Sequence, residues 1–274
     1  MGAKLPPPCA RIQTTYLLRN FHLESLVSTP HILTAKADGV FSIELSRREK
    51  KNAITSAMYR GMSDALDEAA RDTEVRAVLL RGQEDLFTAG NDVGDFLHGA
   101  SRAEREGPRF LYTISQCPKP IVAAVGGLAI GIGTTMLMHC DLVIAADDAR
   151  FQLPFVPLGL CPEAGSSLLL PQMAGHRLAA ELLLLGDYFD AATAQRAGIV
   201  NRVVPADAVL SLAIATAERL AKQPRDALMT TKALLKRPQG RTVREAIDEE
   251  LPHFDRLLQG EEARAIFRAF LEKR

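Results

Sequence analysis

The chain has 274 residues, with 33 lysines and arginines against 33 aspartates and glutamates, so its formal net charge is zero. That length suits one large domain, or one domain with a smaller appendage, and it can bury a full core without disulfides or metals. A neutral chain lacks the basic excess with which proteins coat nucleic acid or anionic membranes. With 47% hydrophobic and 24% charged residues, its composition is that of a soluble globular protein.

The first 28 residues differ from the rest of the chain. They contain Lys4, Arg11 and Arg19, a run of three prolines, and no acidic residue before Glu24. They lack an Arg-rich amphipathic helix and an apolar secretory core. We therefore expect a poorly ordered N-terminal extension, although organellar import by these residues stays open.

The four cysteines are widely spaced and form no CxxC pair, at positions 9, 117, 140 and 161. A zinc site, an iron–sulfur site and a secreted disulfide framework are all poorly supported by this spacing. Reduced thiols in a cytoplasmic protein are the simpler interpretation.

Strand and helix patterns alternate from residue 41 onward. Residues 41–45 alternate apolar and polar side chains, residues 75–80 form a short apolar run, and residues 142–145 repeat that run. Between them, Thr55 is placed to cap a helix in which apolar residues recur at helical spacing. Strands that alternate with helices predict an α/β fold whose sheet is covered on both faces.

Residues 121–138 carry no charge and include Gly127 and Gly131 in a GxxxG spacing, which is compatible with a membrane span. Glycine is too frequent for a stable helix here, and Lys119 and Asp141 flank the segment closely. We predict instead a buried strand at 121–125, a glycine turn, and a buried helix from about Gly133.

The strand patterns stop at Pro205. A helical pattern runs from Asp207 to about Lys222, and Thr242 with Glu245 forms a capping box before a later helix. We therefore divide the chain into the extension (1–28), a core (29–204) and a helical C-terminal subdomain (205–274). Such helices pack either on another subunit or on their own core, and the sequence leaves both open.

Two small-residue loops follow predicted strands. The loop at 126–135 is neither GxGxxG nor a Walker loop, so dinucleotide and nucleoside triphosphate sites are weakly supported. It does expose main-chain N–H groups just before a helix, where an oxygen atom can approach them. The loop at 88–92 is similar. Each could equally be a tight turn without a ligand.

These loops belong to a set of motifs that resembles the enoyl-CoA hydratase/isomerase (crotonase) family. The resemblance covers the chain from about Thr29 to its C-terminus. It implies an α/β fold in which ββα units form a crotonase-like spiral, with a helical C-terminal trimerisation region. The motifs are, in order, Arg47–Ile54, Ala89–Asp92, Pro118–Pro120 before the glycine loop, Phe151–Ser166, Leu185–Gly186, Ala197–Val200 and Val204–Pro205.

The resemblance implies an acyl-CoA thioester substrate whose enolate is stabilised by two main-chain N–H groups. Matched by position, these donors are the amides of Asn91 and Ile132. Preorganised donors lower the barrier because proton removal puts negative charge on the thioester oxygen. The other residues that the resemblance places along the substrate are Lys50, Asn52, Ala53, Ala89, Gly90, Asp92, Gly131, Gly133, Thr135 and Phe155.

The acid–base residues separate the subfamilies. Hydratases of this family use two glutamates, and the matching positions here are Thr135 and Phe155, so the usual route of water addition is disfavoured. The stretch from Pro162 to Ser167 instead resembles the 3,2-trans-enoyl-CoA isomerases of the peroxisomal type. There a single glutamate, matching Glu163, moves a proton between two carbons of the acyl chain.

Glu163 is suited to that role in type and place. One carboxylate suffices because no water is consumed. A helix start favours the ionised carboxylate, whereas apolar neighbours such as Phe155 and Leu160 raise its pKa toward that of a competent base. Without the resemblance, a glutamate after a proline at a helix start is most simply a favourable first-turn charge.

Other functions stay open. A hydratase-like enzyme would use Thr134 or Thr135 to orient water, and a protein that binds acyl-CoA without turnover would leave Glu163 exposed. Further acid–base candidates exist near both loops, although loop, core or strand-start roles are commoner for such residues. They are Asp92, Asp95, His98, His139 and Asp141.

Coenzyme A carries phosphates, and the densest basic cluster in the body of the chain is Arg47, Arg48, Lys50 and Lys51. The resemblance places this loop near the adenosine and pantetheine end, with main-chain contacts near Lys50, Asn52 and Ala53. A solvated charged turn is the competing interpretation. We expect no metal or separate cofactor, no nucleic acid or membrane partner, and a homotrimer or dimer of trimers.

Overall fold

The computed structural model describes residues 29–94, 106–236 and 242–272. The extension at 1–28 and the candidates Asp95 and His98 lie outside the described residues.

The large sheet has the strand order β1-β2-β3-β4-β6-β9. Strands β1 and β2 pair antiparallel, and every further pair in this sheet is parallel. The strands are β1 (Ile32–Ala37), β2 (Val40–Leu45), β3 (Ala77–Arg81), β4 (Ile121–Val125), β6 (Leu142–Ala146) and β9 (Arg202–Val204).

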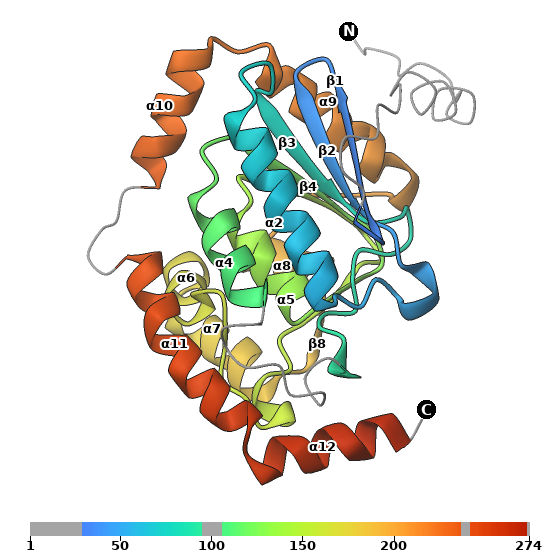
Figure 1. The fold of residues 1–274 in the computed structure, drawn as a ribbon, viewed down its shortest axis with the longest axis vertical. Coiled ribbons are helices and arrows are strands. Elements are labelled where there is room, and N and C mark those ends of the chain that lie inside the picture. The colour runs from blue at the N-terminus through green and yellow to red at the C-terminus, as the bar shows by residue number, and fades with distance from the viewer. Residues whose placement is uncertain (1–28, 95–105, 237–241, 273–274) are drawn as a thin grey trace, which may run out of the picture.

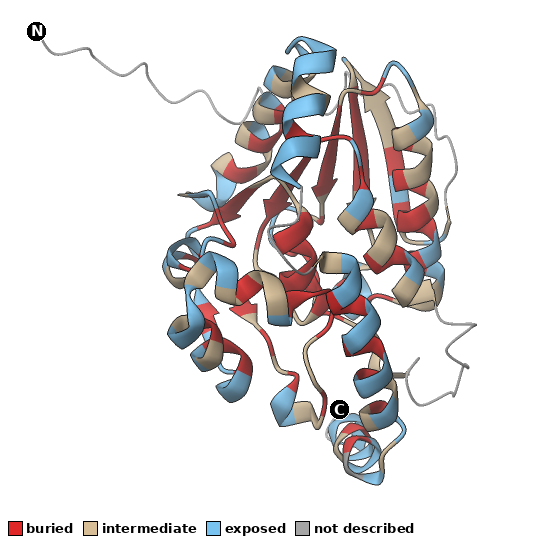
Figure 2. Cartoon of the chain, turned by 90° about the vertical axis from the view of Figure 1, so that its left-hand side faces the viewer, coloured by how far each residue is buried: buried red, intermediate tan, exposed pale blue. Residues whose placement is uncertain are grey.

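Both faces of this sheet are covered by helices, as the sequence predicts (Figure 1). Helix α2 (Ser56–Arg71) packs on β1 and β2 and against α4 (Glu106–Gln116), while α9 (Val209–Ala221) packs on β3, β4 and β6. The inner strands β2, β3, β4 and β6 are almost entirely buried, whereas the edge strands β1 and β9 are more exposed (Figure 2). Thr55 caps α2 by accepting from the Met58 amide, which confirms the predicted helix start.

Helix α9 is the first helix after Pro205, so the helical C-terminal stretch begins by packing on the core sheet rather than by leaving it. Helix α10 (Arg225–Leu235) follows. The predicted capping box at Thr242 and Glu245 is present at the start of α11 (Val243–Leu258), and Gly260 separates α11 from α12 (Glu261–Glu272).

A second, three-stranded sheet was not predicted. It consists of β5 (Leu128–Ile130), β7 (Arg150–Gln152) and β8 (Tyr188–Asp190). Each strand has three residues, too few for a periodic pattern. The segment 121–138 divides into β4, β5, α5 (Ile132–Thr135) and a 3₁₀ turn at Met136–His139. No helix in the described ranges is long and apolar enough to cross a membrane.

The remaining helices follow β7 in the chain; the first two lie beside α11 (Figure 1), whereas the last packs on β7, β8 and β9. They are α6 (Ser166–Ala174), α7 (His176–Ala180), the π-turn Glu181–Leu185 and α8 (Ala191–Arg196). Short 3₁₀ turns lie at Arg48–Lys50, Val156–Leu158 and Ala206–Ala208.

Candidate active site

The two small-residue loops are packed directly against each other. Thr88 donates its amide to Leu128 O (2.8 Å), and the Ile130 amide donates to Thr88 O (3.1 Å). A side chain at Gly90 would place its Cβ 2.7 Å from Ile130 O, and one at Gly133 would come within 2.6 Å of Thr88 Cγ2. Glycine at both positions therefore permits this close approach.

The approach aligns two main-chain N–H groups. Gly90 O accepts from the Ile54 amide and the Asp92 amide donates to Ile54 O, so the Asn91 amide between them faces the opposite way. Ile132 is the first residue of α5, and its amide lies before any intrahelical acceptor. Within the described part of the chain, neither amide has a hydrogen-bond acceptor.

Both residues line a cavity of about 540 Å³, which we call the Lys51 cavity. Its walls come from both loops, from β7, and from α11 and α12 at the C-terminus. The predicted substrate-binding residues Ala89, Gly90, Gly131 and Phe155 are part of its lining, together with Lys51, Gln152, Phe254, Phe267 and Phe270.

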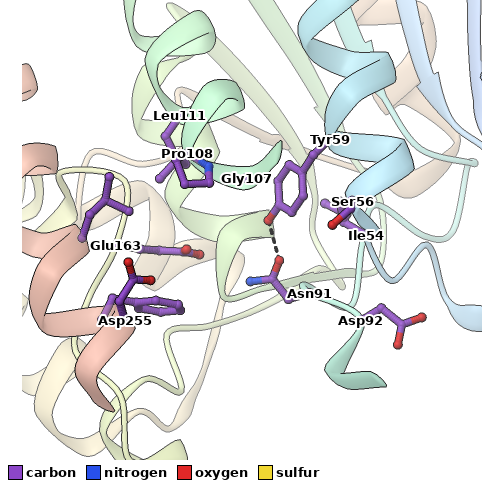
Figure 3. Close-up of a pocket in the computed structure, with 12 residues that line it drawn as sticks. Ile54, Ser56, Tyr59, Asn91, Asp92, Gly107, Pro108, Leu111, Glu163 and Asp255 are labelled. Carbon is purple, nitrogen blue, oxygen red and sulfur yellow. Dashed lines mark hydrogen bonds between the residues drawn. The ribbon is translucent and has the colours of Figure 1, made fainter. Parts of the chain in front are cut away.

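A second cavity, which we call the Glu163 cavity, shares Asn91 and Phe254 with the first. Figure 3 shows Glu163 and Asp255 reaching into it from one side and Tyr59 from the other, where the Tyr59 hydroxyl donates to Asn91 Oδ1. Its remaining lining is mostly apolar, including Ile54, Pro108, Leu111 and Leu251. Asn91 therefore lies where the two cavities meet.

The loop that carries Glu163 is fixed by hydrogen bonds on both sides. The Ser166 amide and hydroxyl both donate to Glu163 O (3.0 and 2.6 Å). Ala164 adopts a positive φ of 59°, and its carbonyl accepts from Nε2 of the buried His139 (2.7 Å). Burial lowers the pKa of His139 to about 4, so this histidine is a neutral core donor, as the sequence suggested.

Glu163 is buried, and its Oε1 has no hydrogen-bond partner among the described residues. Burial, followed by the negative charge of Glu250, raises the pKa of Glu163 to about 8. We expected the start of α6 to favour the ionised Glu163, and this was wrong. The amides of Gly165 and Ser167 at that helix start donate to Glu250 instead.

The positions of the two hydratase glutamates hold no acid. Thr135 is fully buried and donates to Ile132 O, while Phe155 packs in the wall of the Lys51 cavity. Thr134 is also fully buried and donates to Ala129 O, so neither threonine hydroxyl faces a described cavity. Gly133 likewise serves the packing of the loops rather than the cavity lining.

Only part of the basic cluster remains available to a ligand. Arg47 pairs with Asp92 (2.6 Å) and Arg48 with Asp85 (2.6 Å). Lys50 and Lys51 are exposed, and Lys51 lines the cavity named after it. Asp92 borders the Glu163 cavity, but its carboxylate is committed to Arg47 and to the Gly94 amide.

Asn52 and Ala53, predicted to contact the substrate through their main chains, also make hydrogen bonds within the basic loop. The Asn52 side chain is fully buried, accepts from the Arg47 amide and donates to Phe87 O. The Ala53 amide donates to Lys50 O, and its carbonyl accepts from Arg47. Both residues therefore stabilise the basic loop from within. Asp141 is likewise structural, because it accepts from the Ile121 amide and pairs with Lys232.

The sequence argument missed Tyr59, Phe254, Asp255 and Glu250. Tyr59 lies on the helix capped by Thr55, and the other three lie on α11, about 90 residues after Glu163. No local pattern distinguishes them from ordinary helix residues. Among the residues that the structure describes, no group of three or more His, Cys, Asp or Glu side chains is placed to hold a metal ion.

Comparison with known proteins identifies the family. A sequence profile described as enoyl-CoA hydratase/isomerase matches residues 35–274, nearly all of the described chain. The chain belongs to the enoyl-CoA hydratase/isomerase family. The crotonase-like α/β fold predicted from the sequence motifs is thereby confirmed, as is membership of a family of enzymes that act on acyl-CoA.

Solved structures of this family agree with the fold. An enoyl-CoA hydratase/isomerase from Pseudoalteromonas atlantica T6c superimposes with a TM-score of 0.84 at 37% identity, covering 89% of this chain and 98% of the other.

Curated relatives of this family member differ in the reaction that their names give. A 2,3-dehydroadipyl-CoA hydratase from Escherichia coli K12 is 30% identical over 89% of this chain and 96% of its own length. Enoyl-CoA delta isomerase 2 from Rattus norvegicus is 35% identical over 80% of this chain, which spans 58% of that protein. Similarity alone therefore supports the family activity without choosing between hydration and isomerisation.

Proposed function

We propose that this protein is an enoyl-CoA isomerase, which converts 3-enoyl-CoA to 2-trans-enoyl-CoA with Glu163 as the proton carrier. The observation that carries the proposal is the buried Glu163 carboxyl. It faces the cavity that meets Asn91, with a pKa of about 8 and an oxygen unpartnered among the described residues. Groups with strongly shifted pKa values in a cavity are candidates for acid–base catalysis.

The two cavities suggest how the substrate lies. The coenzyme A arm would occupy the Lys51 cavity, where Lys51 is available to a phosphate, and the acyl chain would enter the mostly apolar Glu163 cavity. The thioester would then lie at their junction, with its oxygen accepting from the amides of Asn91 and Ile132. Two such donors favour the enolate over the neutral thioester because they act on charge that forms during the reaction.

The proton balance needs no further reactant. The ionised Glu163 removes a proton from C2, and the electron pair of that C–H bond spreads over the thioester oxygen and C4 as a dienolate. Glu163 then returns the proton to C4, so the double bond moves from C3–C4 to C2–C3. Every atom of the substrate is retained, and the reaction as proposed requires no cofactor or metal, since coenzyme A is part of the substrate.

Hydration is the second candidate, and Asp255 favours it. Its carboxylate lines the same cavity as Glu163, and Figure 3 shows the two side chains next to each other. Two acids beside one acyl chain could position a water between them and divide its proton and hydroxide. Glu163 and Asp255 would then do the work of the two glutamates that are absent at positions 135 and 155.

A spectroscopic assay separates these functions. The wild type, Glu163→Gln and Asp255→Asn would each be given 3-enoyl-CoA and crotonyl-CoA. Isomerisation that is lost in Glu163→Gln and retained in Asp255→Asn supports the proposal. Hydration of crotonyl-CoA that is lost in both variants supports the second candidate. Binding of CoA thioesters without turnover contradicts both and favours a non-catalytic family member.

We also propose, from the family resemblance, that the protein assembles as a homotrimer or a dimer of trimers. Analytical ultracentrifugation of the full chain would give a mass of three or six times 29.8 kDa if this is correct. A monomer at micromolar concentration would contradict it.

A further inference from the structure

The Glu250 carboxylate holds the start of the helix that follows Glu163. It comes from the middle of α11 and is 8% exposed. Its Oε2 accepts from the Gly165 amide (2.7 Å), and its Oε1 accepts from the Ser167 amide (3.1 Å) and the Ser167 hydroxyl. A carboxylate that accepts three hydrogen bonds is stabilised in its ionised form.

These donors are the N-terminal amides of α6, the nine-residue helix that begins at Ser166. Glu163 is three residues before that start and would ordinarily be the anion that benefits from them. Because Glu250 occupies them, Glu163 gains neither the hydrogen bonds nor the helix dipole. Instead it experiences the negative charge of Glu250 inside a dry environment, where such repulsion is strong.

We propose that Glu250 is a positioning residue for Glu163: it holds the Glu163 loop against the cavity and occupies the helix-start donors that would otherwise stabilise the Glu163 carboxylate. The role rests on the proposed function in one respect, since only a proton-carrying Glu163 needs such tuning. Glu250 lies in neither described cavity and acts through Glu163 rather than on the substrate.

Other titratable groups surround Glu163, and each can be assessed. His139 contacts the same loop but is neutral. Tyr59 from α2, Asp92 after the first small-residue loop and Asp255 from α11 share its cavity, and Cys161 lies two residues away. Burial and then the negative charge of Glu250 raise the pKa of Glu163.

The test is a direct titration of the Glu163 carboxyl that does not depend on turnover. The protein would be labelled with ¹³C-glutamate, and the Glu163 resonance assigned by its absence in Glu163→Gln. We expect a pKa near 8 in the wild type and a fall by about 1 in Glu250→Gln, which removes the charge but keeps an acceptor for Ser167. In Glu250→Asp, which keeps the charge, the pKa stays above 7.

Glu249→Gln is the matched control, because it removes one negative charge from the adjacent, exposed position of the same helix. There the pKa of Glu163 should stay at its wild-type value. Should Glu250→Gln fail to fold, Glu250→Ser removes the same charge and leaves room for water. An unchanged pKa in a folded, neutral Glu250 variant overturns the proposal, as does an equal fall in Glu249→Gln.

Enzyme kinetics then provide a second readout. The acid limb of kcat/KM, which reports the free base, should move to lower pH in Glu250→Gln by the same amount as the NMR titration. A purely structural Glu250 would lower activity without moving that limb, which would also count against the proposal. If the isomerase function itself is wrong, turnover is absent but the titration still decides the role of Glu250.

Discussion

The buried charges on the two sides of His139 are arranged in opposite ways. On the side of α10, Lys232 is 5% exposed and pairs with Asp141 (2.7 Å), whose Oδ2 also accepts from the Ile121 amide. Lys119, whose carbonyl accepts from Lys232, donates its own ammonium to Asp72 O and Val75 O. On the side of the cavity, Glu163 has an unpartnered oxygen among the described residues, and the negative charge of Glu250 raises its pKa further.

His139 joins the two regions, since its carbonyl accepts from Lys236 (3.2 Å) and its Nε2 donates to Ala164 O. Lys119 and Lys232 each have hydrogen-bond or ion-pair partners, and these contacts stabilise the packing of α10. The glutamate pair leaves one group incompletely satisfied, which lowers stability and raises basicity. The difference supports the proposal that Glu163 carries out acid–base chemistry, whereas the hydrogen bonds and ion pair around Lys232 are structural.

The largest expected effect is on turnover in Glu163→Gln. Loss of the only proposed proton carrier should lower kcat for isomerisation by about 10³, within the range for general acid–base groups. Steady-state kinetics with 3-enoyl-CoA measure it, with Glu249→Gln as the control that changes an exposed glutamate on α11. A loss of less than tenfold in kcat would contradict the contrast between the two regions, because Glu163 would then have no catalytic role that distinguishes it from the ion-paired Lys232.

The same variant should be more stable than the wild type at high pH. Between pH 4.5 and about 8 the folded protein keeps a proton on Glu163 that the unfolded chain releases, so wild-type stability falls as pH rises through this window. Glutamine has no such loss. The advantage of Glu163→Gln should grow to on the order of 5 kcal/mol above pH 8 and vanish near pH 4. Urea denaturation at several pH values measures it, and a pH-independent difference would contradict it.

Lys232→Met should lower stability and leave the Glu163 carboxyl unaffected, in contrast to Glu163→Gln. It leaves the partly exposed Asp141 without its cation and the buried Lys119 carbonyl without that donor, which should destabilise the protein by roughly 1–3 kcal/mol. The pKa of Glu163 should remain near 8, because Lys232 does not contribute to it. Denaturation midpoints provide the measurement, with Lys222→Met on the exposed end of α9 as control. Equal stability of the two variants would show that the pair is not structural.

Gly133→Ala tests how the packing of the two small-residue loops affects activity, because it changes no charged residue. The added Cβ would lie 2.6 Å from Thr88 Cγ2, so the loops must shift and displace the Asn91 and Ile132 amides. We expect a loss of about 30-fold in kcat/KM. Thr88→Ser removes that methyl but keeps the hydroxyl that donates to Asn52 O, so the double variant should recover most of the activity. If the double variant does not recover activity, the loss in Gly133→Ala is not caused by the contact with the Thr88 methyl group.

Charge reversal at the exposed Lys50 and Lys51 should have the smallest effect. Lys50→Glu with Lys51→Glu should raise KM for acyl-CoA about tenfold, or ~1.4 kcal/mol, with kcat little changed and the effect reduced at high salt. Arg219→Glu with Lys222→Glu, on the exposed side of α9, reverses the same number of charges away from both cavities. An equal rise in KM in that control would indicate general electrostatics rather than a CoA contact.

The sequence predicts those parts of the fold that depend on residues close together in the chain. The strand at 121–125 has its predicted limits, and the caps at Thr55 and Thr242 form as expected. The small sheet was missed because three-residue strands show no periodicity. The helix expected from Gly133 lasts only to Thr135 and becomes a 3₁₀ turn.

The candidate site divides in the same way. Asn91, Ile132 and Glu163 could be named because family motifs surround them, and the structure brings all three to the two joined cavities. Glu250 could not be named, because its effect depends on α11 docking against a helix start 85 residues earlier. That long-range contact also reversed the expected influence of the helix dipole on Glu163.

The central claim, that one buried carboxyl carries the proton, is tested most directly by following the proton. A 3-enoyl-CoA labelled with deuterium at C2 would be converted in ordinary water in a single turnover, and the product examined by mass spectrometry and NMR. A lone, buried Glu163 predicts that a measurable share of the deuterium reaches C4 and that none does so with Glu163→Gln. Complete loss of the label to water, or a hydroxyacyl product, would contradict the account.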